Sequence, residues 1–210
     1  APLDYFATGT ENVRLPVVRH LARKEDKRIG SLLVNPGGPG FGGTYLARNA
    51  AAIFTEEILD RFDVVGWDPR GTGESVPAID CIDNYDPYFA IDPTPDNTEE
   101  RQAIIDSAKS FATACSERTG SLLGHVSTQD SARDLDLLRR ALGEPKVSYF
   151  GFSYGSELGA NWATMFPDTV RAAVFDGAAD PNASAAESMI DQAKGFEIAF
   201  NAFLADCATK

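Results

Sequence analysis

Four short apolar runs, each six residues long, place the strongest constraint on how this chain can fold. Turn-forming residues bound the runs, and stretches with apolar residues at helical spacing separate them. Short buried strands that alternate with helices predict an α/β fold with a mostly parallel sheet and helices on both faces. The runs are GSLLVN (30–35), FDVVGW (62–67), KVSYFG (146–151) and VRAAVF (170–175).

The remaining pattern completes a single domain, which suits a length of 210 residues. A further strand is predicted at 13–19, where Pro16 implies an edge position. One helix is predicted to begin after Ser127 or Thr128 and to close at Gly143. Other helices are predicted at 98–118, 154–166 and 185–206.

Residues 76–126 interrupt the alternation and are rich in proline and aspartate. We interpret them as an excursion outside the sheet. In an exported protein, Cys81 and Cys115 would form a disulfide across this insertion, and Cys207 would be left over. An odd cysteine suggests a partner on another chain or on sequence outside these 210 residues. Three buried free thiols remain the alternative that the cysteines alone leave open.

Composition excludes several classes of function. The net charge is −12, from 31 acidic and 19 basic residues, so contacts to nucleic acid or to anionic membranes are not expected. The cysteine spacings match no zinc pattern, and the chain has only two histidines, so neither a metal nor a cofactor is expected.

Three glycine-rich segments follow predicted strands: NPGGPGFGG (35–43), DPRGTGES (68–75) and GFSYG (151–155). In a parallel sheet, functional groups gather at the carboxyl ends of the strands, where all three segments fall. In the second segment, Asp68 and Arg70 are predicted to pair and hold the turn. A direct contact of Arg70 with substrate is the alternative.

The segment GFSYG has the Gly-x-Ser-x-Gly pattern between a strand and an amphipathic helix. That context predicts a strained turn that exposes Ser153 as a nucleophile, rather than an ordinary serine in a glycine-rich turn. The N–H of Tyr154 would bind an oxyanion, and Gly38 is predicted to supply the second donor. A phosphate cradle is disfavoured at 35–43, because no Gly-Lys-Ser/Thr follows and Pro39 breaks the Gly-x-Gly-x-x-Gly register.

Several segments together resemble the tripeptidyl aminopeptidase branch of the α/β-hydrolases, which are exported bacterial serine exopeptidases related to prolyl aminopeptidases. The segments are APLDY, NPGGPGFGG, FDVVGWDPRGTGES and YFGFSYGSELGANWATMFPDTVRAAVFDGAADP. The resemblance implies that Ser153 is the nucleophile, that Gly38 and Tyr154 form the oxyanion hole, and that peptides are cleaved from a free N-terminus without metal or cofactor. It also implies a secreted or cell-surface location.

The resemblance divides the chain into two parts. Residues 1–183 would form the N-terminal part of the hydrolase core, with 76–126 as a disulfide-prone insertion. Residues 184–210 look like the beginning of a helical cap, so the fold is expected to be cut off near the start of that cap.

No histidine follows Ser153, although the α/β-hydrolase triad has the chain order Ser, acid, His. His20 and His125 both precede the nucleophile and do not lie where this fold delivers its base. Asp176 could be the acid, but a structural role is favoured for it. The acid and the histidine are therefore expected on a further part of the same polypeptide, and this chain alone is expected to be inactive. The alternatives are an esterase or amidase of the same fold and a non-catalytic binding homologue.

Overall fold

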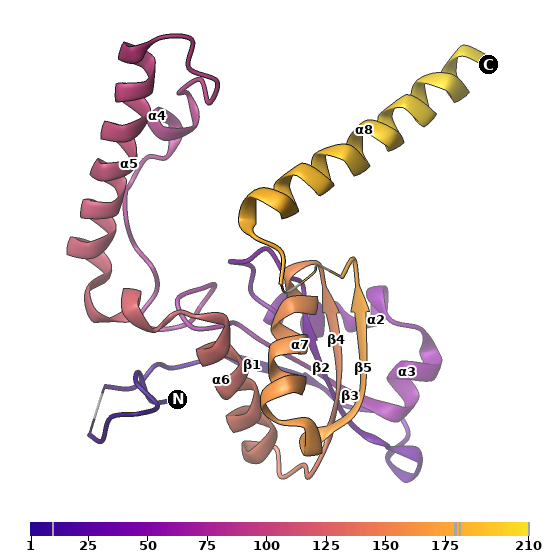
Figure 1. Cartoon of the computed structure of the whole chain (residues 1–210). Helices are drawn as coiled ribbons and strands as arrows, with labels where there is room; N and C mark the ends of the chain where they lie inside the picture. Colours follow the sequence, from indigo (N-terminus) through magenta and orange to yellow (C-terminus); the bar gives the residue numbers. More distant parts are fainter. Residues whose placement is uncertain (10, 179, 181, 210) are drawn as a thin grey trace.

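The computed structural model describes residues 1–9, 11–178, 180 and 182–209. These residues form a five-stranded sheet in the order β1-β3-β2-β4-β5, and β1 alone of the described strands runs antiparallel to its neighbour (Figure 1). The mostly parallel sheet and the edge position of the first strand are confirmed. The strands are β1 (Val17–His20), β2 (Gly30–Asn35), β3 (Phe62–Trp67), β4 (Val147–Phe152) and β5 (Val170–Asp176).

The first strand begins later than the predicted 13–19. Arg14 pairs with Val76 as an isolated bridge, so the chain joins the sheet only after Pro16, at Val17. A proline has no N–H to donate, which favours a strand that starts after it.

Helices cover both faces of the sheet, as the pattern predicted. Leu32 and Val34 pack with α1, α2 and α3 on one face, whereas Leu33 points to the other face and packs with α6 and α7. This alternation within one strand follows from the two-residue period of a β-strand. The helices are α1 (Thr44–Arg48), α2 (Ala50–Ile53), α3 (Glu56–Arg61), α6 (Thr128–Ala141) and α7 (Tyr154–Met165), with short 3₁₀ turns η1 (Glu25–Lys27) and η3 (Pro167–Thr169).

The predicted ends of α6 are also confirmed. Ser127 is its N-cap, and the Ser127 hydroxyl accepts a hydrogen bond from the Asp130 N–H at 3.1 Å. Gly143, with φ 71°, ends the helix in a left-handed conformation that a glycine adopts without strain.

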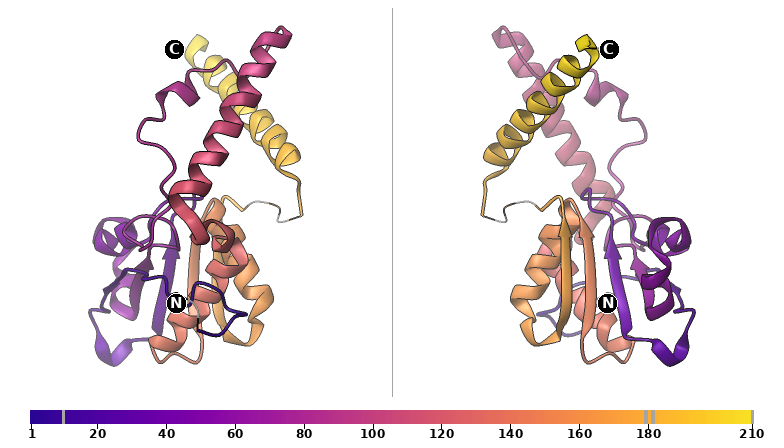
Figure 2. Two further views of the ribbon diagram at one scale, coloured as in Figure 1. Left: turned by 90° about the vertical axis from the view of Figure 1, so that its left-hand side faces the viewer. Right: turned by 90° about the vertical axis from the view of Figure 1, so that its right-hand side faces the viewer.

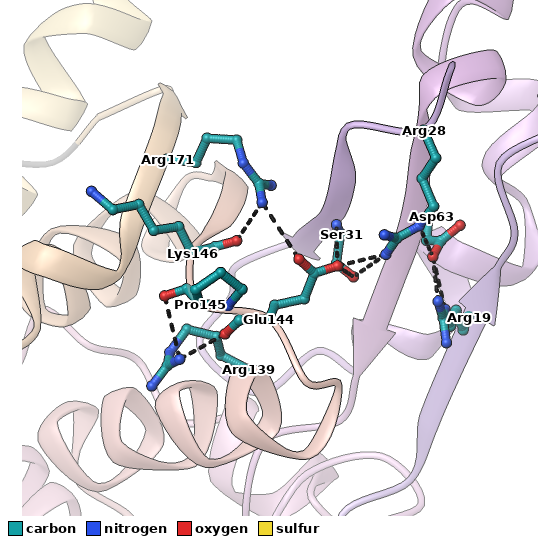
Figure 3. A network of polar contacts seen from close by, with 9 residues as sticks. All are labelled: Arg19, Arg28, Ser31, Asp63, Arg139, Glu144, Pro145, Lys146 and Arg171. Atoms are coloured by element: carbon teal, nitrogen blue, oxygen red, sulfur yellow. Dashed lines mark hydrogen bonds and ion pairs between the residues drawn. The ribbon is translucent and has the colours of Figure 1, made fainter. Parts of the chain in front are cut away.

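An ion-pair network ties the strands together at the amino end of the sheet (Figure 3). Asp63 accepts from Arg19 and Arg28, at 2.5 and 2.7 Å. Arg28 also reaches Glu144 at 2.5 Å, and Arg171 lies 3.4 Å from the other oxygen of Glu144. Burial alone would raise the pKa of both carboxyls, but their hydrogen bonds outweigh it and lower both pKa values. The network therefore holds both carboxylates in the ionised form.

Residues 76–126, here called the arm, leave the sheet as predicted. They contain α4 (Asp86–Phe89), α5 (Thr98–Thr119) and the 3₁₀ turn η2 (Gly120–His125). The predicted disulfide between Cys81 and Cys115 is present. Aromatic side chains gather at the far end of the arm and line an apolar hollow of about 390 Å³; they include Tyr85, Tyr88, Phe89 and Phe111.

The last helix, α8 (Ala185–Thr209), stands clear of the sheet on the same side as the arm (Figures 1 and 2). Its large apolar side chains are exposed, including Met189, Phe196, Phe200 and Phe203, and Cys207 is an exposed free thiol. Although α8 has 25 residues, no helix among the described residues is both long and apolar enough to cross a membrane.

Candidate active site

Ser153 lies in the turn between β4 and α7, at the carboxyl end of the sheet, and its side chain is exposed. Its backbone has φ 51° and ψ −124°, and it is the one non-glycine residue with positive φ in the described part of the chain. Such a conformation is costly for a residue with a Cβ and persists where the surroundings hold it. The turn lifts the Ser153 hydroxyl clear of the strands.

Main-chain hydrogen bonds hold this turn on both sides. The Ser153 N–H donates to the Asp176 carbonyl at 2.8 Å, which ties the turn to the end of β5. The Ser153 carbonyl accepts from the N–H and the hydroxyl of Ser156, at 2.8 and 2.6 Å. The buried Tyr149 hydroxyl donates to the Gly155 carbonyl at 2.7 Å. These bonds offset the strain at Ser153.

The two glycines of the motif have no room for a side chain. A Cβ on Gly155 would lie 2.7 Å from the Asn35 carbonyl oxygen, and a Cβ on Gly151 would lie 2.5 Å from the Gly155 carbonyl carbon. The sequence pattern therefore follows from close approach of β2, β4 and the first turn of α7.

The loop after β2 packs directly against Ser153. Gly37 has φ 89°, and a Cβ there would collide with the Phe152 carbonyl oxygen and lie 3.1 Å from the Ser153 Cβ. The Gly37 N–H donates to the Asn35 side chain at 2.8 Å. By contrast, the N–H groups of Gly38 and Tyr154 have no acceptor within the described residues. Both remain available to a ligand.

The side chain of Tyr154 connects this turn to the start of α6. Its hydroxyl and the Thr128 hydroxyl are 2.8 Å apart in a partly buried position. Burial raises the pKa of Tyr154, so the phenol stays protonated.

A hollow of about 440 Å³ lies beside Ser153. Gly177 and Asp180 line it from the end of β5, and Met189 and Asp191 line it from the first turns of α8. The space next to the hydroxyl is thus bounded by both the sheet and α8.

The structure contradicts the predicted pairing of Asp68 with Arg70. The Arg70 guanidinium is fully buried and binds both oxygens of Asp134 on α6 at 2.7 Å. It also donates to the carbonyls of Pro2, Leu3 and His125. Asp68 instead accepts from the N–H groups of Thr44 and Glu74, at 3.0 and 2.9 Å. Arg70 therefore anchors the N-terminal segment and the base of the arm, and its buried donors are not available to a substrate.

Comparison with known proteins places this geometry in a family. The family model for the alpha/beta hydrolase fold matches residues 30–210 of this chain. The chain belongs to the alpha/beta hydrolase family.

Curated relatives narrow the class of hydrolase. The chain is 41% identical over 210 residues to serine protease Hip1 of Mycobacterium tuberculosis and 39% identical over 204 residues to tripeptidyl aminopeptidase of Streptomyces lividans. It is 42% identical over 212 residues to carboxylesterase B of M. tuberculosis. These alignments cover 99%, 93% and 99% of this chain, but only 40%, 38% and 40% of the relatives. The relatives support a serine hydrolase of this fold. This chain spans about two fifths of the length of those relatives.

The fold places the other candidate residues of the hydrolase in different parts of the molecule. His20 pairs with Val64 near the start of β3, at the amino end of the parallel strands and thus at the opposite end of the sheet. His125 ends η2, and its carbonyl accepts from Arg70. Asp176 meets Ser153 through its main chain, and its exposed carboxylate has no partner among the described residues. Of the AADP sequence that follows β5, Ala179 and Pro181 lie outside the described residues.

Two buried polar residues that organise the fold, Asn35 and Asp134, were not predicted from the sequence. Asn35 directly precedes Pro36 and Gly37, and an asparagine two residues before a turn N–H is a recognisable turn signal. Asp134 lies beside Leu135 on the buried side of α6, and a carboxylate within an apolar stripe indicates a buried cation as its partner.

Proposed function

We propose that Ser153 is the nucleophile of a serine hydrolase, and that the full-length protein removes residues from the free N-terminus of peptides. One observation carries the first part: an exposed Ser153, held at φ 51°, lies against a loop and a helix start that present uncommitted N–H groups at Gly38 and Tyr154. Acyl transfer by serine needs a displayed hydroxyl and donors for the oxyanion.

The reaction would proceed through an acyl-enzyme. The Ser153 oxygen bonds to the substrate carbonyl carbon while its proton passes to a base. The carbonyl electron pair moves onto the oxygen, which Gly38 and Tyr154 bind. The bond to the leaving amine then breaks as the amine takes up the proton, and the acyl group stays on the Ser153 oxygen. Water next attacks the acyl carbon while its proton passes through the base to the Ser153 oxygen, and the carboxylic acid product is released.

The base and its acid partner are proposed to come from the remainder of the polypeptide. His20 lies at the opposite end of the sheet from Ser153, and His125 precedes the nucleophile in the chain, whereas the base of this fold follows it. The relatives are more than twice as long as this chain, which leaves ample sequence for both residues. The 210-residue chain by itself is therefore expected to be inactive.

Peptide N-termini are favoured as substrates because two relatives are named as a serine protease and a tripeptidyl aminopeptidase. An esterase is the second candidate, since a relative that is 42% identical to this chain is named carboxylesterase B. The aminopeptidase and the esterase would use the same acyl transfer to serine, with an amine or an alcohol as the leaving group. A non-catalytic binding homologue is the third.

Location outside the cytoplasm, secreted or on the cell surface, is part of the proposal. The Cys81–Cys115 disulfide supports it, because disulfides persist in oxidising compartments.

A fluorophosphonate probe tests the nucleophile. We expect the full-length protein to be labelled at Ser153. In Ser153→Ala the labelling rate should fall by about 10⁴-fold or more, because no other group replaces the attacking oxygen. Ser116→Ala, on the exposed side of α5, is the matched control and should be labelled normally. An unlabelled full-length protein, beside a control hydrolase that reacts, would falsify the enzymatic proposal in favour of the binding homologue.

Substrate turnover tests the leaving group. We expect a tripeptide anilide with a free amino group to be hydrolysed, and its N-acetylated form to be hydrolysed at least tenfold more slowly. Efficient turnover of short-chain esters, together with no effect of N-acetylation, would instead establish the esterase.

A further inference from the structure

The side chain of Asn35 lies at the contact between the two segments that carry the proposed oxyanion donors. Asn35 is the last residue of β2 and is 1% exposed. It pairs in register with Gly151 of β4, and this pairing fixes the position of Asn35 along the strands relative to the turn at Ser153.

The loop that follows Asn35 is rich in glycine, so its own residues restrict its conformation only weakly. Gly37, Gly38 and Gly40 all have positive φ, at 89°, 111° and 108°. Glycine adopts such angles without strain, but it also has many other conformations of similar energy. The hydrogen bond from the Gly37 N–H to Asn35 Oδ1, 2.8 Å long and buried, selects one of them.

The same oxygen also lies close to the turn at Ser153. A Cβ on Gly155 would lie 2.9 Å from Asn35 Oδ1 and 2.7 Å from the Asn35 carbonyl oxygen. A Cβ on Gly37 would in turn lie 3.1 Å from the Ser153 Cβ and 3.0 Å from the Tyr154 nitrogen. One buried amide therefore sets the separation between the loop that carries Gly38 and the turn that carries Tyr154.

We propose that Asn35 is a positioning residue for the oxyanion hole. It occupies the Gly37 N–H, which leaves the Gly38 N–H as the donor of the loop, and it fixes that donor relative to Tyr154. Asn35 itself need not touch the substrate. The inference rests on the proposed function, because the two donors matter only if Ser153 attacks an acyl group.

The experiment compares Asn35→Ala with Asn35→Ser in the full-length protein. Alanine removes the acceptor, whereas a serine hydroxyl can accept from the N–H two residues later, though with a shorter side chain. A donor displaced by about 1 Å can cost about 10²-fold in rate. For Asn35→Ala we expect fluorophosphonate labelling of folded protein to slow by about 100-fold, and kcat to fall while KM stays within about twofold.

Asn35→Ser should recover part of the rate and be labelled about three- to tenfold more slowly than the unmodified protein. A merely structural role would lower the melting temperature and leave labelling per folded molecule unchanged. Equal labelling of Asn35→Ala and the unmodified protein, or equal losses in both variants, would overturn the inference. If Asn35→Ala does not fold, Asn35→Ser decides alone, and labelling at the unmodified rate overturns it.

The two proposals fail in different ways. An unmodified full-length protein that resists the probe contradicts the proposed function. A reactive unmodified protein with an unaffected Asn35→Ala variant contradicts the role of Asn35 alone.

Discussion

The two ends of the sheet are built on different principles. At the amino end, charged side chains from three strands and two loops join in a network around Asp63 and Glu144. At the carboxyl end, the contacts around Ser153 are mostly made by main-chain atoms, with glycines where the segments approach most closely. Side-chain ion pairs resist separation of the strands, whereas bare backbone allows the close approach that an oxyanion site needs. We infer that the first end mainly stabilises the fold and the second mainly determines reactivity.

Among variants that keep Ser153, Gly37→Ala should give the largest effect and should act at the carboxyl end. Its Cβ would push the loop away from Phe152 and Ser153, so the labelling rate of the full-length protein should fall by about 10²–10³-fold, as for loss of an oxyanion donor. Gly40→Ala is the matched control: its φ is also positive, at 108°, but a Cβ there meets nothing within 4 Å. We expect less than a tenfold loss for Gly40→Ala, and similar losses in both variants would show that backbone strain alone is responsible.

Glu144→Gln, at the amino end, should instead lower stability and leave the labelling rate nearly unchanged. Removing its charge leaves Arg171 without an ion-pair partner among the described residues and weakens the link to Arg28, so the free energy of unfolding should fall by about 3 kcal/mol in urea titration. The labelling rate of Ser153 in folded protein should remain within about twofold.

Glu56→Gln is the control for this variant, because Glu56 is exposed and lies 3.8 Å from Arg23. It should leave the urea midpoint unchanged. A Glu144→Gln protein that unfolds normally but reacts slowly would break the proposed division between the two ends.

The pH dependence of stability should sharpen the comparison. The pKa values of Asp63 and Glu144 are lowered from their ordinary values of 3.8 and 4.5. The folded state therefore binds fewer protons than the unfolded state below about pH 5, and the stabilisation is lost as pH falls through the folded pKa values. We expect the urea midpoint to drop steadily from pH 5 to pH 3 and to drop less steeply in Glu144→Gln. Parallel curves would show that the network does not control acid stability.

Tyr154→Phe should have the smallest effect. The variant loses the bond to Thr128, at a cost of about 1 kcal/mol, but keeps the backbone N–H that would bind the oxyanion. The labelling rate should fall by less than about fivefold. Thr128→Val should lose a similar amount, and the double variant should lose no more than either alone. Additive losses would show that the two hydroxyls do not act as a pair.

The regular elements of this fold were predictable because their signals are local. Alternating apolar residues specify buried strands such as β2, and a serine cap with a closing glycine specifies the ends of α6. The turn at Ser153 was predictable because a strand, two glycines and a helix occur in direct succession. The edge strand was misplaced by a few residues because the competing bridge between Arg14 and Val76 joins segments far apart in the chain.

The partners of charged and polar side chains were not predictable in this way. Arg70 is two residues from Asp68, yet it binds Asp134, 64 residues further along the chain. A local pairing was the simpler expectation, but burial beside α6 favours the bidentate contact with Asp134.

Local signals in the sequence were sufficient to predict a mostly parallel sheet with Ser153 displayed on a strained turn, because periodicity and glycine placement act over a few residues. The burial of Asn35 at the contact between the two segments that carry the proposed donors, and the role of Arg70 as a buried anchor, became evident only from the folded structure. Those facts depend on which strands become neighbours, and strand order is set by packing of the whole core rather than by any short segment.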